Sequence, residues 1–403
     1  MNRSGIFLFL CGLATCVLIC TLWTISNTPS ELTAEFMRCQ FLLNATSHLH
    51  SENRTFVKKH PLDYFLKFNA MGGEGCNEFK KQMDFQSALS LDLEKEFPIG
   101  FSIAIFKNIN QIARLLRIIY RPQNFYVIHV DRKSSDEFYQ AVVEVQKCFG
   151  ENVRVVPREE SVKVRWCTFT VLELELIAAR ILIQMGKWKY FINLTGQELP
   201  LRTNLELVLA LKALNGSNLV EGTVKHRNKD RVPNANLSFP VTWVKGGVHV
   251  ALRREFVEFM LFDQRASEIA RTLQTHAFNK CPDEQFFATL AYNPHLAAPG
   301  ACLRVHESDD KGVDITRLHN LIRYKKWYGE DCPTKTQNSI CILGSMSLSR
   351  LTQAPELIAN KFYEDYYPEA YDCLELFLLK RTYNPRPFNT TAFSRLYCSQ
   401  EHL

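Results

Sequence analysis

The sequence predicts an α/β fold of the doubly wound, nucleotide-binding kind, preceded by an N-terminal membrane anchor. Three observations support this prediction: an uncharged apolar run near the start, short apolar runs that alternate with helical periodicity further on, and polar residues that directly follow two of those runs. The 403 residues are 46% hydrophobic and 22% charged, so the chain can bury a sizeable core and lacks the composition of a disordered protein. One large domain, or two tightly packed lobes, is expected.

The chain has a formal net charge of +6, without a dense block of lysines or arginines. Such a balance fits an anionic ligand such as a nucleotide diphosphate, and it gives no case for nucleic acid binding. Nucleic acid is therefore not among the expected partners.

Residues 5–25 form the apolar run, and only four residues, Arg3 among them, precede it. Its length matches the hydrocarbon thickness of a bilayer, and the short basic tail favours a cytoplasmic N-terminus. A cleaved signal peptide is the alternative, but the run is longer than a usual signal core and no small-residue cleavage site ends it. We therefore expect a single-pass type II membrane protein, with a cytoplasmic tail over residues 1–4, an anchor over 5–25 and the rest of the chain in the lumen.

Sequons and cysteines indicate a lumenal location too. Sequons for N-linked glycans start at Asn44, Asn53, Asn215, Asn236 and Asn389. Another starts at Asn193, but it lies in a predicted apolar strand, so we expect it to stay unused. Of the 13 cysteines, three lie in the apolar run, and the remaining ten form no CxxC pair and no metal-like cluster with histidines. Disulfide bonds in an oxidising compartment are the better interpretation.

Strands and helices alternate after a mixed, polar stretch over 26–95 that is typical of a stem and an N-terminal subregion. Short apolar runs predict buried strands over 99–106, 125–130, 153–156 and 190–194. Apolar residues at helical spacing predict helices over 109–119, 135–147 (capped by Ser135) and 168–185. Strands that alternate with helices pair in parallel through right-handed crossovers, which gives a doubly wound nucleotide-binding half.

A second half is expected after about residue 204, where short strands, such as one over 247–252, mix with helices. Both halves belong to one catalytic domain over residues 96–380, and a tail follows over 381–403. We find no internal repeat and no low-complexity tract in the chain.

Polar residues at strand ends mark the expected ligand site, because ligands of doubly wound sheets bind outside the carboxyl ends of the strands. Asp131 directly follows the strand over 125–130, and Gly196-Gln197-Glu198 follows the strand over 190–194. Asp131 either accepts hydrogen bonds from a ribose or a base, or caps the next helix, and the sequence leaves both open.

Glu284 and Lys361 each have a chemical and an ordinary interpretation. Glu284 opens an apolar helix after Pro282, where it is either a general base in a partly buried site or a first-turn glutamate favoured by the helix dipole. Lys361 is either a cation for a diphosphate or a solvated lysine. The chain contains no Asp-x-Asp, the pattern with which many sugar-nucleotide transferases hold a divalent cation, so lysine or arginine side chains remain to neutralise a leaving diphosphate.

Taken together, motifs over about residues 97 to 375 resemble the core 2 and I-branching β-1,6-N-acetylglucosaminyltransferase family, whose relatives include the peptide O-xylosyltransferases. Their order and spacing identify the family, where any one alone would not. The motifs are Arg114-Leu-Leu-Arg-Ile-Ile-Tyr120, Pro122-Gln-Asn-Phe-Tyr126, Ile128-His-Val-Asp131, Trp188-Lys-Tyr-Phe-Ile-Asn-Leu194, Arg254-Glu-Phe-Val257, Pro282-Asp-Glu284 with Ala288-Thr289, and Ala359-Asn-Lys-Phe362.

The resemblance implies a GT-A-type fold with a mixed sheet, UDP-GlcNAc as the donor, inversion at the anomeric carbon and no metal ion or other cofactor. It implies that Glu284 is the catalytic base, that Lys361 contacts the UDP diphosphate and that Asp131 belongs to the nucleotide site.

On the acceptor side, Glu221 and Lys229 resemble residues that contact the acceptor glycan. Tyr324 stands where the family has an acceptor-stacking tryptophan. The partners implied are therefore a UDP-sugar and a glycan.

Two positions depart from the family pattern. Asn338 stands where the family carries a second basic residue, an arginine, so diphosphate neutralisation is weakened by several kcal/mol unless Lys335 or Arg350 substitutes. Glu198 stands where the family has an aspartate, which keeps the carboxylate on a longer arm.

The resemblance also implies three disulfides, Cys39–Cys373, Cys76–Cys148 and Cys332–Cys341. Another family pair is missing at both ends, with Val127 and a residue near Glu175 in its place. The resemblance assigns no partner to Cys167, Cys281, Cys302 and Cys398, and a link between Cys281 and Cys302 is one possibility.

The leading hypothesis is thus a Golgi enzyme that transfers GlcNAc to a hydroxyl of a core 1-like O-glycan. A peptide O-xylosyltransferase-like enzyme is the second, and the closer match to the branching group and the lack of a long extra C-terminal domain argue against it. A lumenal pseudoenzyme that binds a glycan or nucleotide is the third, and Asn338 is its motivation.

Overall fold

The computed structural model describes residues 30–44, 57–68, 73–83, 90–276, 280–318, 320–330 and 332–403. The expected anchor over 5–25 and the sequon at Asn53 lie outside these residues. Within the described ranges, no helix is both long enough and apolar enough to cross a bilayer.

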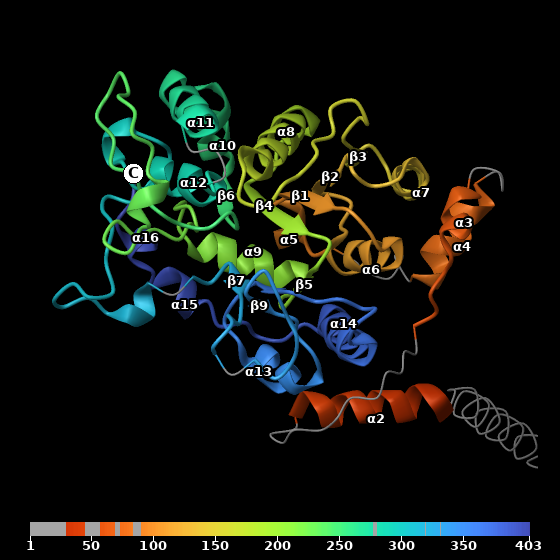
Figure 1. The fold of residues 1–403 in the computed structure, drawn as a ribbon. Helices are drawn as coiled ribbons and strands as arrows, with labels where there is room; N and C mark the ends of the chain where they lie inside the picture. Colours follow the sequence, from red (N-terminus) through yellow and green to blue (C-terminus); the bar gives the residue numbers. More distant parts are fainter. Residues whose placement is uncertain are drawn as a thin grey trace, which may run out of the picture.

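A five-stranded sheet in the order β3-β2-β1-β4-β6 forms the centre of the domain (Figure 1). Its first four strands pair in parallel, and β6 pairs antiparallel with β4. The strands are β1 (Ile99–Ile105), β2 (Phe125–Val130), β3 (Val153–Val155), β4 (Tyr190–Thr195) and β6 (Ala251–Arg253). The mixed α/β fold with a largely parallel sheet is therefore confirmed.

Three helices connect the parallel strands, and each begins at a polar side chain that accepts a backbone hydrogen bond. The caps of α6 (Ile109–Ile119), α7 (Asp136–Lys147) and α8 (Phe169–Met185) are Asn108, Ser135 and Thr168. The predicted Ser135 cap is thus confirmed.

Helices cover both faces of the sheet and divide the core in two. Helices α6 and α7 pack on one face, and α8, α10 (Arg254–Phe262) and α11 (Gln264–His276) pack on the other (Figure 1). Side chains of β1 alternate between these faces, so Phe101 and Ile103 join the core beneath α6 while Ser102 points toward α8.

The strand expected over 247–252 is wrong in its first four residues, because β6 begins only at Ala251. Asn193 of β4 explains the difference. Its side-chain amide donates to the carbonyl of Val248 at 2.7 Å and its oxygen accepts from the amide of Val250 at 3.0 Å. These side-chain bonds replace the backbone ladder that a longer strand would need.

A smaller three-stranded sheet and a hairpin lie beside the carboxyl edge of the main sheet. In the small sheet, β10 (Ile358–Asn360) pairs antiparallel with β5 (Glu198–Pro200) and parallel with β7 (Arg323–Tyr324). The hairpin joins β8 (Thr336–Gln337) to β9 (Ile340–Cys341). The remaining helices are α2 (Ser30–Asn44), α3 (Leu62–Leu66), α4 (Glu74–Gln82), α5 (Asp92–Lys95), α9 (Asn204–Ala213), α12 (Asp283–Ala291), α13 (Leu348–Gln353), α14 (Pro368–Tyr383), α15 (Thr391–Ser394) and α16 (Tyr397–Gln400), with short 3-10 turns over Lys229–Arg231, Pro294–Leu296, Ile315–Arg317 and Ser345–Ser347.

The structure contains the three expected disulfides, Cys39–Cys373, Cys76–Cys148 and Cys332–Cys341. A link between Cys281 and Cys302 is wrong, since the remaining pairs are Cys167–Cys281 and Cys302–Cys398. Helix α12 separates the two cysteines: Cys281 lies just before it, and the amide of Cys302 bonds to Ala291 at its far end. Nine helical residues span roughly 13 Å, far beyond disulfide reach.

Candidate active site

A hollow of about 170 Å³ lies at the carboxyl ends of β1, β2 and β4, where the topology predicts a ligand site. We call it the strand-end hollow; its polar lining is His129, Asp131, Glu175, Asn193, Thr195, Gln197 and His249. Asp131 does not cap the next helix, because Ser135 does so and Asp131 Oδ1 accepts from the amide of Lys133 instead, at 2.8 Å. Its Oδ2 lies 3.5 Å from Lys133 Nζ, whose side chain is exposed, so a ligand in the hollow competes only with this surface ion pair for the carboxylate.

Two histidines present opposite hydrogen-bonding groups to this hollow. His129 Nε2 accepts from the amide of Val162 at 2.9 Å, so its proton lies on Nδ1. His249 Nε2 lies 3.0 Å from Glu198 Oε1 and donates to it, so its Nδ1 is an acceptor. Both Nδ1 atoms are buried without a partner in the described structure. Burial lowers the pKa of His129 to about 4, and burial together with Lys325 lowers that of His249 to about 3, so both rings are neutral near pH 7.

Glu198 is fully buried at the start of β5 and anchors the wall between the hollow and the small sheet. Its carboxylate accepts from Arg323 Nε at 3.0 Å and from Asn360 Nδ2 at 2.8 Å, besides His249 and the amide of Thr195. Burial alone would raise the pKa of Glu198, but Arg323 and His249 hold it well below its ordinary value. The longer arm that replaces the family's aspartate is thus completely engaged by the protein.

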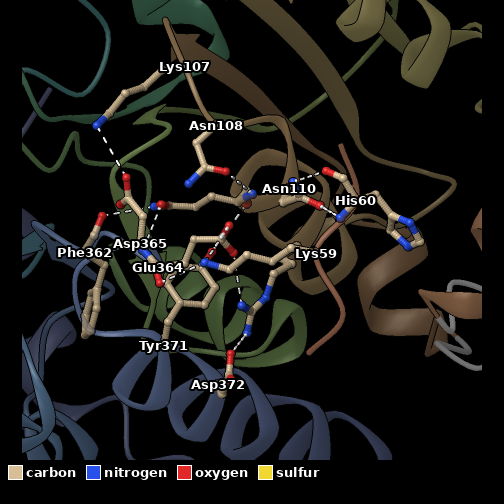
Figure 2. A network of polar contacts seen from close by, with 12 residues as sticks. Lys59, His60, Lys107, Asn108, Asn110, Phe362, Glu364, Asp365, Tyr371 and Asp372 are labelled. Atoms are coloured by element: carbon tan, nitrogen blue, oxygen red, sulfur yellow. Dashed lines mark hydrogen bonds and ion pairs between the residues drawn. The ribbon is translucent and has the colours of Figure 1, made fainter. Parts of the chain in front are cut away.

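Lys361 lies next to this wall because the segment that follows β10 is tied down on both sides. The amide of Phe362 donates to Gln197 O at 2.7 Å, and Gln111 Nε2 on α6 donates to both Phe362 O and Gly196 O. Figure 2 shows this segment, with Lys59 beside Glu364. Arg114 Nη1 also donates to Glu364, at 3.1 Å. The ends of β4 and β10 are therefore locked together.

The Lys361 ammonium group is mostly buried and donates to Gln337 O at 3.1 Å. Burial lowers its pKa, Glu198 opposes that shift, and Lys325 adds to it. Lys361 is thus no solvated lysine, and Lys325 is close enough for the two cations to repel each other.

Neither expected substitute for the family's arginine faces Lys361 closely. Lys335 is exposed, with its Nζ 5.0 Å above the ring of Tyr366, and Arg350 bonds the hydroxyl of Tyr324. Asn338 itself is exposed at the tip of the β8–β9 hairpin with φ 50°, followed by Ser339 with φ 62°. Two positive φ angles in a two-residue turn favour asparagine over arginine at this position.

Lys325 is a cation that the sequence did not single out. Burial lowers its pKa, and carboxylates of Glu221, Glu198 and Glu284 partly restore it. It therefore lies between the Glu198 wall and the outer carboxylates.

Glu284 lies in the first turn of α12, where its side chain is 30% exposed and pairs with Arg231 Nη1 at 2.7 Å. The neighbouring Asp283 is buried, and burial followed by the Glu284 charge raises the pKa of Asp283 to about 7. A half-exposed carboxylate held by an arginine is accessible to an incoming hydroxyl group, as a general base requires.

Glu221 and Glu284 are brought together by Gly246. The amide of Gly246 donates to Glu284 O at 2.6 Å, and a Cβ added at Gly246 would lie 2.2 Å from the carbonyl oxygen of Glu221. Glu221 Oε2 accepts from Asn320 Nδ2 at 3.1 Å. Only glycine permits the two segments to approach this closely.

Lys229 completes what we call the carboxylate rim, which also contains Glu221, Arg231 and Glu284. Lys229 is exposed in the same 3-10 turn as Arg231. Tyr324 is half-buried on β7, beside Ala359 of β10, and lines an open cavity of about 580 Å³ with Lys325 and Arg350.

Asp131 lines the strand-end hollow with His249, and His249 bonds Glu198. Lys325 interacts electrostatically with Glu198, Lys361 and Glu284, and we call this series of contacts the path from the hollow to Glu284. Sequence analysis missed Arg231, Lys325 and His249, because none of them belongs to a motif. Within the described ranges, no group of three His, Cys, Asp or Glu side chains is arranged to hold a metal ion.

The predicted glycosylation sites within the described residues are exposed, namely Asn44, Asn215, Asn236 and Asn389. Asn193, in contrast, is 2% exposed and uses its side-chain amide in the bonds to residues 248 and 250. An amide in that position has no space for a glycan.

Comparison with known proteins gives a consistent result. The family model of the Core-2/I-Branching enzyme matches residues 99–352. A zebrafish (Danio rerio) protein named beta-1,3-galactosyl-O-glycosyl-glycoprotein beta-1,6-N-acetylglucosaminyltransferase 4 is 31% identical over 329 residues, which cover 74% of each chain. A mouse (Mus musculus) N-acetyllactosaminide beta-1,6-N-acetylglucosaminyl-transferase is 32% identical over 333 residues, 77% of this chain and 79% of its own.

Proposed function

Because this chain belongs to the Core-2/I-branching enzyme family of glycosyltransferases, we propose that it transfers GlcNAc from UDP-GlcNAc to a hydroxyl of an O-glycan and forms a β-1,6 branch on a core 1-like acceptor. The observation that carries the proposal is the path from the strand-end hollow to Glu284. It offers a nucleoside site, cations and a base in the order in which a sugar nucleotide and an acceptor hydroxyl would meet them.

In the proposed reaction, Glu284 accepts the proton of the acceptor hydroxyl while the oxygen of that hydroxyl attacks C1 of the GlcNAc. The C1 bond to the UDP oxygen breaks, and the bonding electrons leave with UDP, so the configuration at C1 inverts. Arg231 orients the Glu284 carboxylate at 2.7 Å. A positioned base of this kind contributes about a hundredfold or more to the rate.

Lys361 and Lys325 are proposed to neutralise the diphosphate without a metal ion. Burial destabilises the charged form of both lysines, because it removes water from their ammonium groups. A bound diphosphate would replace this water with negative charge and hydrogen-bond acceptors. Lys325 would then supply the second positive charge that Asn338 does not.

The remaining parts of the proposal concern location. An anchor over residues 5–25 with a type II topology would place the glycosylated domain in the Golgi lumen, and residues 26–95 would link the two. The disulfide Cys39–Cys373 supports this arrangement, because it fastens the membrane-proximal helix α2 to α14 of the domain.

The decisive experiment offers the full-length protein UDP-GlcNAc or UDP-xylose together with core 1-like glycans or serine peptides, with and without EDTA, and identifies products by mass and linkage. The expected result is a β-1,6-linked GlcNAc product that EDTA does not abolish. A xylosylated peptide would assign the other transferase class. Retained UDP binding without any product would assign a pseudoenzyme, and rescue of an EDTA-treated protein by Mn²⁺ would contradict the metal-free site.

A further inference from the structure

Glu175 is a buried carboxyl group in the strand-end hollow that the proposed reaction does not use. It lies on α8, is 4% exposed and lines the hollow together with His129 and Asp131. Its Oε2 has no hydrogen-bond partner within the described structure. A buried polar atom that stays unpaired costs free energy, so such an atom in a ligand-sized hollow indicates a bound group.

The groups that face Glu175 leave it without a counterion. Ser102 on β1, whose Oγ is likewise without a partner in the described part of the chain, and Asn193 on β4 are its uncharged polar neighbours, and both favour the charged carboxylate and so limit the rise in its pKa. Arg323, the cation that acts on its charge, is bound by Glu198. Burial, with a smaller contribution from Glu198, raises the pKa of Glu175 to about 8. Its carboxyl group therefore keeps a proton, and hence a hydrogen-bond donor, at neutral and mildly acidic pH.

The geometry points to Glu175 as a further donor-binding residue, whose protonated carboxyl group donates a hydrogen bond to an oxygen of the bound uridine. This inference rests on the proposed function, which puts the diphosphate beside Lys361 and leaves the hollow to the nucleoside. Uridine carries both acceptor oxygens and N–H or O–H donors. The hollow matches it with donors on Glu175 and His129 and with acceptors on Asp131 and His249.

Ionisation of Glu175 removes this donor and puts a second negative charge near Asp131. The contribution of Glu175 to UDP affinity should therefore be constant in mildly acidic solution and fall as the pH rises through about 8. His129 and His249 do not titrate in this range, because their pKa values are about 4 and about 3. Lys325 and Lys361 have lowered pKa values and also lose charge at high pH, so the wild-type profile alone does not isolate Glu175.

Glu175→Gln isolates it, because glutamine keeps an N–H donor in a similar shape and does not titrate. Titration calorimetry with UDP at pH 6.5 and pH 9.0 compares the full-length wild type with this variant. The control is Glu173→Gln, which changes a half-exposed glutamate on the same helix that does not line the hollow. Between the two pH values, wild type and control should lose about tenfold more affinity than Glu175→Gln, since only about a tenth of the carboxyl groups stay protonated one pH unit above the pKa.

Glu175→Leu adds a second measurement at pH 6.5. It should bind UDP about tenfold more weakly than wild type and bind inorganic pyrophosphate equally well, because only the uridine loses a partner. Parallel pH profiles for wild type and Glu175→Gln, with UDP still bound, would overturn the role of Glu175 alone. A wild-type protein that binds no UDP at any pH would instead overturn the proposed function.

Discussion

The strand-end hollow and the carboxylate rim differ in how firmly their side chains are held. Glu198, at the wall of the hollow, is fully buried and bonded to four different residues. Glu284, at the rim, is 30% exposed and its side chain pairs with Arg231 across a solvent-accessible surface. The hollow end of the site is thus part of the folded core, whereas the rim end is a surface on that core. Substitutions should affect stability at the first end and catalysis or binding at the second.

Glu198→Gln should produce the largest change in free energy. An amide in place of the carboxylate leaves Arg323 buried without its counterion and points an N–H group at other donors, which lowers the free energy of unfolding by roughly 3 to 5 kcal/mol. Thermal unfolding of the variant beside wild type measures this loss. Because the pKa of Glu198 is lowered in the folded state, its stabilisation is present above the ordinary value of 4.5 and fades as the pH falls through the folded value. The two proteins should therefore converge only in strong acid, and equal melting temperatures at pH 7 would contradict the comparison.

Glu284→Gln should show the opposite pattern. The catalytic rate should fall about a hundredfold or more, as expected for the loss of a positioned base, while UDP affinity and melting temperature stay close to wild type. Transfer kinetics measure the rate, UDP titration measures the affinity, and thermal unfolding measures the melting temperature. Glu151→Gln, an exposed change before β3, is the control and should leave all three unchanged. A fully active Glu284→Gln enzyme would remove the base assignment.

Sequence patterns predicted the parts of the fold that depend on neighbouring residues. The apolar run of β1 and the helical spacing of α6 are local signals, and both elements appear where expected. The strand predicted over 247–250 does not form, because the side chain of Asn193 on β4, more than fifty residues away in the sequence, hydrogen-bonds to its backbone. Local patterns contain no information on such a competitor.

Arg114 shows the same limit for the polar groups. It lies within a predicted amphipathic helix, yet it is 2% exposed and binds Glu364, Asp372 and Glu375, all some 250 residues further along the chain. Glu175 and His249 are comparable, because burial by distant segments determines their protonation. Sequence similarity predicted Asp131, Lys361 and Glu284 as site residues, but the hydrogen-bonding groups between them required the structure.

Lys361→Ala tests the boundary between the two ends. Lys361 is mostly buried like the residues of the hollow, but within the described part of the chain its Nζ has a single hydrogen bond, to Gln337 O. We expect UDP to bind about tenfold more weakly and catalysis to fall further, because the charge on the leaving group grows in the transition state. Calorimetry and transfer kinetics distinguish the two effects. Lys335→Ala removes an exposed lysine that lies on Tyr366 and is the matched control; an equal loss of affinity there would assign the diphosphate to Lys335 instead.

Asn338 gives the smallest expected effects, because it is exposed and its role is in the hairpin turn. Asn338→Gly should leave stability and UDP affinity nearly unchanged, since glycine adopts the observed φ of 50° without strain.

Asn338→Arg should lower the free energy of unfolding by about 1 kcal/mol, because a longer side chain is less favourable in a left-handed conformation. The same change places a cation next to Gln337, the acceptor of the Lys361 ammonium, and a solvent-exposed charge there should strengthen UDP binding by at most about fivefold. That gain should shrink at 1 M salt, where the screening length is only about 3 Å. A turnover that rises with UDP affinity would mean that Lys325 and Lys361 neutralise the diphosphate incompletely. An unchanged affinity in low salt would mean that the hairpin tip lies outside the field of the diphosphate.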